Sequence, residues 1–267
     1  MSVSAFVERY GPWAVVAGAS EGIGASFSRK LASRGLNLVL LARRAGPLEK
    51  LAAELRDAHG VEVQVQSLDL GGADVVDGLS RATKGRDVGL VIYNAAYSPI
   101  GAFIDIEVEE HLKAVDVNVL GPLRVSHYFG RRLADRGKGG MILMSSMSSF
   151  QGTAMVANYA ATKAYDAILA EGLWYELRQR GVDVLGCIAG ATLTPNYEGS
   201  TDKIPSSGLA RPMDPDDVTE QALQDLGKRP TGVSGRRNRL ASALLTRLLP
   251  RRAAIDMVSK ETEHMYR

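Results

Sequence analysis

The fold of this chain is decided by residues 13–24, WAVVAGASEGIG. The apolar run at 13–18 predicts a buried strand, and a helical pattern at 22–34 follows it directly. Between them lies Gly18-Ala19-Ser20-Glu21-Gly22-Ile23-Gly24, whose glycines allow a tight turn and a close approach of the backbone to a pyrophosphate. The helix would present its amide groups and positive dipole end to that phosphate. The spacing is Gly-x3-Gly-x-Gly rather than Gly-x-Gly-x-x-Gly, but its place between a strand and a helix predicts phosphate binding.

The same alternation of strand and helix patterns continues along the chain. Short apolar runs predict strands at 13–18, 37–42, 61–66, 88–93, 141–146 and 182–189, with a weaker one near 231–233. Helical patterns lie between them at 22–34, 46–59, 73–83, 109–136 and 157–180. Such alternation produces right-handed crossovers and a parallel sheet covered on both faces. We therefore expect a single doubly wound α/β domain with a parallel seven-stranded sheet.

Length and composition set limits on the function. The chain has 267 residues, near the upper size for one hydrophobic core, and 45% apolar and 23% charged residues are typical of a globular protein. A formal charge of +2 without blocks of like charge argues against a nucleic-acid partner. Cys187 is the single cysteine, which excludes an internal disulfide and leaves no metal-ligand cluster. Since no apolar run is long enough for a membrane span or a signal peptide, we expect a cytoplasmic protein.

A tyrosine and a lysine four residues apart mark a second candidate site. Tyr159 and Lys163 fall in a segment of helical composition, so they share one face of the helix, one turn apart. A phenol has a pKa of about 10, and a nearby ammonium favours its ionised form. Such a pair can exchange a proton with a substrate oxygen near neutral pH. The spacing also occurs by chance on solvated helices, so its meaning depends on the rest of the chain.

The two motifs together resemble the short-chain dehydrogenase/reductase family, whose strand and helix order agrees with this chain over about residues 13–235. Its Asn-Asn-Ala-Gly sequence appears as Tyr93-Asn94-Ala95-Ala96, which keeps the middle pair and has a methyl group at Ala96. Its Pro-Gly-x3-Thr stretch, which meets the nicotinamide, appears as Ala189-Gly190-x3-Thr194. The resemblance implies a Rossmann-type fold and a nicotinamide dinucleotide cofactor.

Two further residues match the catalytic tetrad of the family. Asn118 resembles its helix asparagine; the alternative is a capping or kink residue beside Gly121-Pro122. Ser146 stands thirteen residues before Tyr159, where the family has its catalytic serine. Because other serines crowd this loop, the assignment of Ser146 rests on the spacing.

The resemblance implies reversible hydride transfer between the nicotinamide and a carbonyl or alcohol. Tyr159 would donate the proton in reduction and accept it in oxidation. Lys163 would favour the phenolate and hold the nicotinamide ribose. Ser146 would hydrogen-bond the substrate oxygen, and Asn118 would hold a water that leads protons away from Lys163.

The family positions also imply a set of cofactor contacts. They are Gly18, Ser20, Glu21, Gly22, Ile23, Gly24, Arg43, Arg44, Asp69, Leu70, Asn94, Ala95, Ala96, Tyr159, Lys163, Gly190, Thr192 and Thr194. The second strand ends in Leu41-Ala42-Arg43-Arg44, without the acid that selects NAD. A guanidinium there accommodates the 2′-phosphate of NADP. We expect NADP(H) rather than NAD(H), with Arg43 as the better candidate and Arg44 able to share the contact.

Two stretches carry weaker signals. The long loop at 192–212 predicts a lid over the substrate, and its few large apolar residues predict that it is loose without ligand. After the catalytic domain, 1–235, comes a basic amphipathic tail, 236–267. The tail would pack on the domain or a partner subunit, or else contact a membrane surface or an acyl chain. We expect a homodimer or homotetramer.

The opening Tyr10-Gly11-x-Trp13-Ala14-Val15-Val16 resembles the long-chain 3-oxoacyl and 17β-hydroxysteroid reductase branch of the family. That resemblance implies a large apolar ketone or alcohol substrate. Two alternatives remain: a non-catalytic nucleotide-sensing module on the same fold, and an enzyme of the extended family that acts on nucleotide sugars. The retained tetrad argues against the first, and the absence of a sizeable sugar-binding segment argues against the second.

Overall fold

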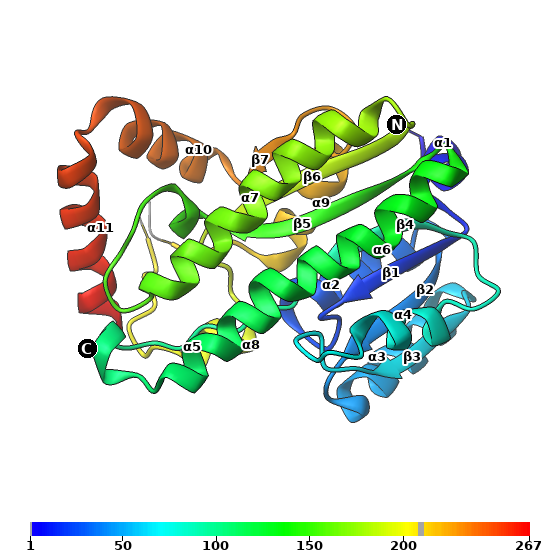
Figure 1. The fold of residues 1–267 in the computed structure, drawn as a ribbon, viewed down its shortest axis with the longest axis horizontal. Coiled ribbons are helices and arrows are strands. Elements are labelled where there is room, and N and C mark those ends of the chain that lie inside the picture. Colours follow the sequence, from blue (N-terminus) through cyan, green and yellow to red (C-terminus); the bar gives the residue numbers. More distant parts are fainter. Residues whose placement is uncertain (1, 208–210) are drawn as a thin grey trace.

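The computed structural model describes residues 2–207 and 211–267. Within these residues it has one parallel sheet of seven strands in the order β3-β2-β1-β4-β5-β6-β7 (Figure 1). The strands are β1 Trp13–Ala17, β2 Asn37–Ala42, β3 Val63–Ser67, β4 Val88–Tyr93, β5 Gly139–Ser146, β6 Val182–Ala189 and β7 Thr231–Val233. The strand order reverses between β1 and β4, which places a crevice for ligands at their carboxyl ends. The expected doubly wound α/β fold is confirmed.

Helices cover both faces of the sheet. The α-helices of the described residues are α1 Val3–Tyr10, α2 Gly22–Ala32, α3 Ala45–His59, α4 Val75–Ala82, α5 Val108–Val115, α6 Gly121–Arg136, α7 Ala157–Arg178, α8 Pro195–Glu198, α9 Pro215–Asp225, α10 Arg236–Ala243 and α11 Arg251–Tyr266, and seven of them pack on the sheet. The first core cluster joins α1, α2, α3 and α9 to one face of the sheet. The second joins α4, α6 and α7 to the other face.

Strand β1 shows how the sequence pattern produces these two clusters. Ala14 and Val16 point into the first cluster, whereas Trp13, Val15 and Ala17 point into the second. Both faces are buried, so the strand is apolar throughout and does not alternate with polar residues.

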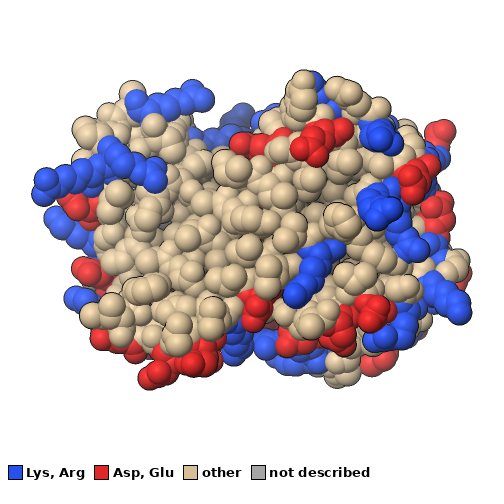
Figure 2. Space-filling view, viewed as in Figure 1, with Lys and Arg blue, Asp and Glu red and all other residues tan. Residues whose placement is uncertain are grey.

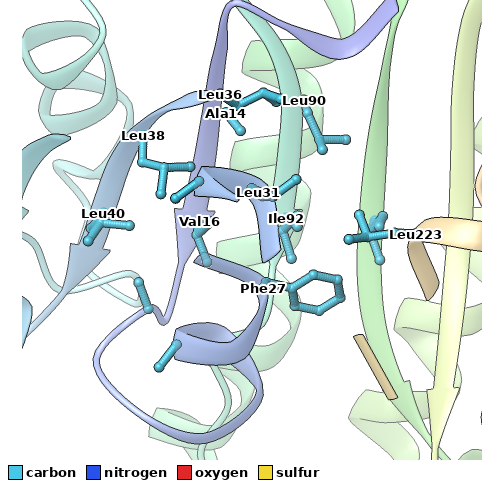
Figure 3. Close-up of a cluster of buried hydrophobic side chains, with 14 of the residues drawn as sticks. Ala14, Val16, Phe27, Leu31, Leu36, Leu38, Leu40, Leu90, Ile92 and Leu223 are labelled. Atoms are coloured by element: carbon cyan, nitrogen blue, oxygen red, sulfur yellow. The ribbon is translucent and has the colours of Figure 1, made fainter. Parts of the chain in front are cut away.

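Helix α2 packs directly on the strands that lead into the glycine-rich loop. Phe27 and Leu31 are fully buried, and Figure 3 shows them beside Val16 and Ile92. This packing fixes the first turn of α2 relative to the ends of β1 and β4.

The structure differs from the sequence expectations in two helical regions. The helix expected at 109–136 is α5 and α6 joined by a π-helical turn, Asp116–Leu120. Pro122 follows the turn and cannot donate a backbone hydrogen bond, which accounts for the widened turn before it. Helix α1 was not expected; Ser2 caps it, and Phe6 and Tyr10 bury its inner face.

The carboxyl-terminal residues form α10, a π-helical turn and α11, which stand at the edge of the layered domain (Figure 1). Helix α11 is tied to the loop before α7. The Ser259 hydroxyl accepts from the Ala154 amide at 3.1 Å, and the hydroxyls of Thr262 and Thr153 lie 2.8 Å apart. In the described part of the chain, no helix combines the length and apolarity needed to cross a membrane.

Candidate active site

The glycine-rich loop and the end of β4 approach each other too closely for larger residues. Gly18 has a φ of +83°, and a Cβ there would lie 2.6 Å from the Ala95 nitrogen. A Cβ on Gly24 would lie 2.0 Å from the Gly18 oxygen. The same oxygen accepts a hydrogen bond of 3.0 Å from the Asn94 side chain. These contacts hold the first turn of α2 against the two central strands.

A cavity of about 750 Å³ opens over this loop at the carboxyl ends of β1, β2 and β4. Its size suits a large ligand, and its place is the topological switch point of the sheet. The predicted cofactor residues on its wall are Gly18, Ser20, Glu21, Gly22, Ile23, Arg43, Arg44, Asp69, Leu70, Asn94, Ala95, Ala96 and Thr194. Gly24 is absent from this wall because it packs beneath the loop. The glycine cradle and the cavity together fit a dinucleotide.

The two arginines after β2 have different surroundings. Arg44 forms an ion pair of 2.6 Å with Glu21 of the glycine-rich loop. Arg43 is exposed and lines the cavity, and among the described residues its guanidinium has no ion pair or hydrogen bond. The cation available to an anionic ligand is therefore Arg43, while Arg44 is already held by a carboxylate.

A second cavity of about 450 Å³ joins the first, because Ile23, Asn94 and Thr194 line both. Tyr159 and Ser146 lie on its wall. Seven other predicted residues line it as well: Ile23, Asn94, Ala96, Lys163, Gly190, Thr192 and Thr194. Tyr159 is half-buried and comes from the first turn of α7, while Ser146 ends β5. The structure thus brings the tyrosine, the lysine and the serine to one cavity.

Lys163 is buried behind Tyr159. Its Nζ lies 5.8 Å from the centre of the Tyr159 ring and donates to the Met144 carbonyl and the Asp166 carboxylate, each at 2.9 Å. Burial lowers the pKa of Lys163, but the nearby charges of Asp166 and then Tyr159 raise it, and the net direction is upward. The lysine therefore remains an ammonium beside the tyrosine.

The two serines at the end of β5 have different hydrogen-bond roles. The Ser145 hydroxyl is buried and donates to the Lys163 carbonyl at 2.7 Å, which fastens α7 to the sheet. The Ser146 hydroxyl accepts from the amide and hydroxyl of Ser148, at 3.3 and 3.0 Å. Its own hydrogen remains to be donated into the cavity.

Asn118 is fully buried in the π-helical turn. Its carboxamide accepts from the Tyr97 amide at 2.8 Å and donates to the Tyr97 carbonyl at 2.7 Å and the Thr162 hydroxyl at 3.0 Å. The side chain therefore joins the loop after β4 to α7. The expected proton relay through Asn118 stays a prediction.

A family model for short chain dehydrogenases matches residues 12–204. The chain belongs to the short-chain dehydrogenase family. Its members are oxidoreductases, and this chain acts on CH–OH or C=O groups of small molecules.

Relatives of this short-chain dehydrogenase lie in the expected branch. A 7β-hydroxysteroid dehydrogenase of Clostridium sardiniense is 33% identical over 234 residues, 88% of this chain and 89% of that protein. A very-long-chain 3-oxoacyl-CoA reductase of Podospora anserina is 38% identical over 180 residues, 65% of this chain and 53% of that protein. A human protein named inactive hydroxysteroid dehydrogenase-like protein 1 is 30% identical over 235 residues, 85% of this chain and 69% of that protein.

Solved structures agree with these relatives. A 7β-hydroxysteroid dehydrogenase structure has a TM-score of 0.88 at 29% identity and covers 95% of this chain and 98% of that one. A short-chain dehydrogenase from Sphingobium yanoikuyae in complex with NADPH has a TM-score of 0.76 at 29% identity, with coverage of 84% and 87%.

The cavity of this short-chain dehydrogenase is completed by residues that lie after the family match and were not predicted from the sequence. They are Leu245 next to α10, and Val258, Thr262, Met265 and Tyr266 of α11. The pKa of Tyr266 is raised because its phenol is buried, and Tyr159 adds to the effect. The apolar spacing of 255–265 signals a helix with one buried face. It does not tell which surface that face covers.

The predicted lid packs against the same helix. Its ends are joined by a bridge between Thr192 and Met213. The Thr201 hydroxyl donates to the Met265 carbonyl at 2.7 Å, and Lys203 Nζ donates to the His264 carbonyl at 2.8 Å. Leu209, one of the apolar residues expected in the lid, lies outside the described residues. The described part of the lid and the tail thus form a joint wall.

Cys187 lies away from the cavity walls, inside the sheet. The cysteine is fully buried in β6, and burial raises the pKa of its thiol to about 12. Among residues 2–207 and 211–267, no three His, Cys, Asp or Glu side chains are grouped so that they could hold a metal ion.

Proposed function

We propose that this short-chain dehydrogenase transfers hydride between NADP(H) and the carbonyl or secondary alcohol of a large apolar substrate, steroid-like or 3-oxoacyl. The observation that carries the proposal is the junction of the two cavities. Tyr159, Ser146 and Lys163 line the smaller cavity, which shares Ile23, Asn94 and Thr194 with the larger one over the glycine-rich loop. The NADPH complex and the 7β-hydroxysteroid dehydrogenase among the similar proteins support it.

A bound nicotinamide supplies or accepts the hydride, and this chain's own residues handle the proton and the charge. In reduction, the Tyr159 hydroxyl gives its proton to the substrate oxygen, and in oxidation the phenolate takes it back. Ser146 donates its hydroxyl hydrogen to the same oxygen and stabilises developing negative charge. The buried Lys163 ammonium stabilises the phenolate electrostatically. Asn118 would hold a water that leads protons away from Lys163.

The cofactor assignment rests on Arg43. Its guanidinium lines the nucleotide cavity without a competing carboxylate, whereas Arg44 is paired with Glu21. A guanidinium recognises the 2′-phosphate that distinguishes NADP from NAD. The other proposed cofactor contacts lie on the two cavity walls, except Gly24, which packs beneath the glycine-rich loop.

The substrate assignment rests on the smaller cavity. Apolar side chains from four regions line it: Met144 and Met147 at the end of β5, Val156 before α7, Leu245 next to α10, and Val258 and Met265 of α11. Tyr197 of the lid adds an aromatic ring. Such a wall favours a bulky hydrocarbon skeleton over a small polar ketone. We accordingly regard 1–235 as the catalytic domain, 192–212 as its lid and 236–267 as a tail that closes the substrate cavity.

The deciding experiment incubates the protein with NADPH or NADH and a panel of steroid ketones, 3-oxoacyl thioesters and small polar ketones, and follows nicotinamide absorbance. We expect turnover of the large apolar ketones, faster with NADPH. The same panel of alcohols with the oxidised cofactors measures the reverse reaction. Turnover confined to the small polar ketones would contradict the proposed substrate class.

The competing function is a non-catalytic nucleotide-sensing module, and the human relative named inactive shows that the fold does not require activity. NADPH binding without turnover of any carbonyl or alcohol, in either direction, would favour the sensing module. The retained Tyr159, Lys163 and Ser146 argue for the enzyme, because a sensor needs no proton donor. We propose a cytoplasmic homo-oligomer as its setting.

A further inference from the structure

Three leucines of the tail form an exposed stripe on one side of a helix. Leu240, Leu244 and Leu248 follow one another at intervals of four residues, from α10 into the π-helical turn at 244–248, so they lie on one face. Their exposed fractions are 70%, 40% and 75%. The opposite face points inward, because Asn238 is buried and Leu245 lines the smaller cavity. Single exposed leucines are common on protein surfaces, but a contiguous stripe indicates a contact with a partner.

Arginines flank this stripe, with no acid among them. The basic segment, residues 236–252, carries six exposed arginines: Arg236, Arg237, Arg239, Arg247, Arg251 and Arg252. The sequence has no Asp or Glu from 226 to 255. Figure 2 shows Lys and Arg side chains at the upper left, over the place of α10 and the start of α11 in Figure 1. The basic segment therefore presents a stripe of leucines among positive charges.

The basic segment is anchored to the domain from its inner side. The Asn238 side chain donates to the Ser234 carbonyl at 2.8 Å and lies 3.3 Å from the Met213 sulfur. At the other end of the segment, the Arg251 guanidinium donates to the Phe150 carbonyl. These contacts hold the helix in place without the exposed leucines, so packing within the domain does not explain the stripe.

The chemistry of this face fits an anionic bilayer better than other partners. In an amphipathic helix of this kind, the apolar side chains enter the bilayer and the arginines lie at anionic headgroups. A second copy related by a two-fold axis would bring the same arginines towards one another, and the segment has no carboxylate to pair with them. A nucleic acid would contact the arginines and leave the leucines in water. A lipid surface uses both features.

We propose that the basic segment docks this protein on the surface of an anionic lipid bilayer, with Leu240, Leu244 and Leu248 inserted and the flanking arginines at the headgroups. The helix lies on the membrane, because α10 and the turn after it are shorter than the about 20 residues of a span. Leu245, on the inner face of the same helix, lines the smaller cavity, so docking places that cavity next to the lipid. The proposal does not depend on the reaction proposed above.

The test is flotation of the full chain with vesicles of phosphatidylcholine, either alone or with about one third phosphatidylglycerol. The parent should float with the anionic vesicles, stay largely unbound with the neutral ones, and dissociate as added salt screens the charges. Leu240→Ser combined with Leu248→Ser should weaken binding by about tenfold or more, because it removes apolar area from the bilayer. Arg239→Gln and Arg247→Gln should each weaken binding about fivefold.

Matched controls carry the same kinds of substitution elsewhere on the surface. Ile104→Ser removes an apolar side chain that is 90% exposed, and Arg131→Gln removes an exposed arginine of α6. Neither control should change the binding to vesicles. All these side chains are largely exposed, so each variant should keep the melting temperature of the parent.

Three results would overturn the proposal. The first is a parent protein that stays off the anionic vesicles; light scattering of the double serine variant then tells whether the face joins a second copy. The second is an equal loss of binding in the segment variants and in the controls. The third is binding that duplex DNA abolishes and the serine variant leaves unchanged, which would assign the arginines to a nucleic acid. Because flotation is read without turnover, a failure of the proposed oxidoreductase function would leave this result unaffected.

Discussion

The two edges of the sheet each bring together a cation, a carboxylate and a tyrosine, and they use them differently. At the amino edge, the Asp183 carboxylate accepts from Arg9 at 2.5 Å and from the Tyr10 hydroxyl at 2.7 Å. At the carboxyl edge, Lys163 is the one side chain among the described residues that donates to Asp166, and Tyr159 lines a cavity. The first cluster fastens α1 to the start of β6. In the second cluster, the tyrosine hydroxyl remains available to hydrogen-bond a ligand.

The comparison extends to the arginines. Arg9 is held by a carboxylate, and that hydrogen bond raises the pKa of the guanidinium, against the effect of burial. Arg43 lies at the nucleotide cavity with no such partner among the described residues. Polar groups that are hydrogen-bonded within the protein stabilise its fold, while polar groups that point into a cavity contribute to the binding of a ligand. The same substitution should therefore affect stability at one edge and function at the other.

The largest expected difference is between the two tyrosines. Tyr159→Phe should lower kcat by about a hundred- to ten-thousandfold, because it removes a general acid, while NADPH affinity and the melting temperature change little. Tyr10→Phe, the matched control, should leave kcat near that of the parent and lower the melting temperature. Comparable losses of activity in both variants, measured by NADPH absorbance, would contradict the different roles assigned to the two tyrosines.

The second prediction compares the arginines. Arg43→Ala should weaken NADPH binding by about ten- to a hundredfold, the value of a charge-assisted phosphate contact, with little effect on NADH. Arg9→Ala should leave NADPH affinity unchanged and lower the free energy of unfolding. Isothermal titration and denaturant unfolding provide the two readouts. If Arg43→Ala leaves NADPH affinity unchanged and Arg44→Ala weakens it strongly, the phosphate contact belongs to Arg44. Equal use of NADPH and NADH by the parent protein would refute the preference for NADP(H).

The third prediction concerns the pH dependence of stability at the amino edge. Burial and then the hydrogen bond to Asp183 raise the pKa of Tyr10 in the folded protein above the usual value. The folded state therefore holds this proton more tightly, so the contribution of Tyr10 is fully present below about pH 10 and is lost as pH rises towards the folded-state pKa. The parent should be more stable than Tyr10→Phe by about 1.5 kcal/mol near neutral pH, and the gap should narrow above pH 10. A constant gap in urea unfolding across this pH range would contradict the assignment.

The smallest effect is expected where the lid meets the tail. Thr201→Val removes the hydrogen bond to the Met265 carbonyl, worth about 1 kcal/mol. Amide exchange near the end of α11 should accelerate about fivefold, and addition of NADPH with a substrate analogue should reduce exchange in the lid more than in any strand. Thr153→Val, at another contact of α11, is the control, because it leaves the lid contact in place. Exchange in the lid that does not respond to ligands would mean that the loop is prepacked.

The core of the fold could be predicted because its signals are local. Apolar runs and helical periodicity identified the strands of the sheet, and the short strand β7 was the weakest signal. Helix α1 was missed because eight residues give little periodicity. The turn within 109–136 was missed because a π-helical turn keeps helical composition.

The residues of the candidate site that belong to family motifs could be predicted from the sequence, and the residues outside those motifs could not. Asp166 carries no motif, and its importance depends on burial of its side chain beside Lys163. Tyr266 lies more than a hundred residues after Tyr159, and nothing local indicates that the two share a cavity. The distinction between Arg43 and Arg44 likewise needed the position of Glu21, which pairs with one of them.

The sequence by itself determined the alternation of strands and helices, the glycine-rich turn, and the one-turn spacing of Tyr159 and Lys163. These features depend on residues that are neighbours along the chain, so the physics of backbone and periodicity fixes them. Only the tertiary structure decided which strands adjoin, that the pair of Lys163 and Asp166 is buried, and that α11 closes the cavity. Those outcomes depend on packing and desolvation between segments far apart in sequence, and such partners exist only once the chain has folded.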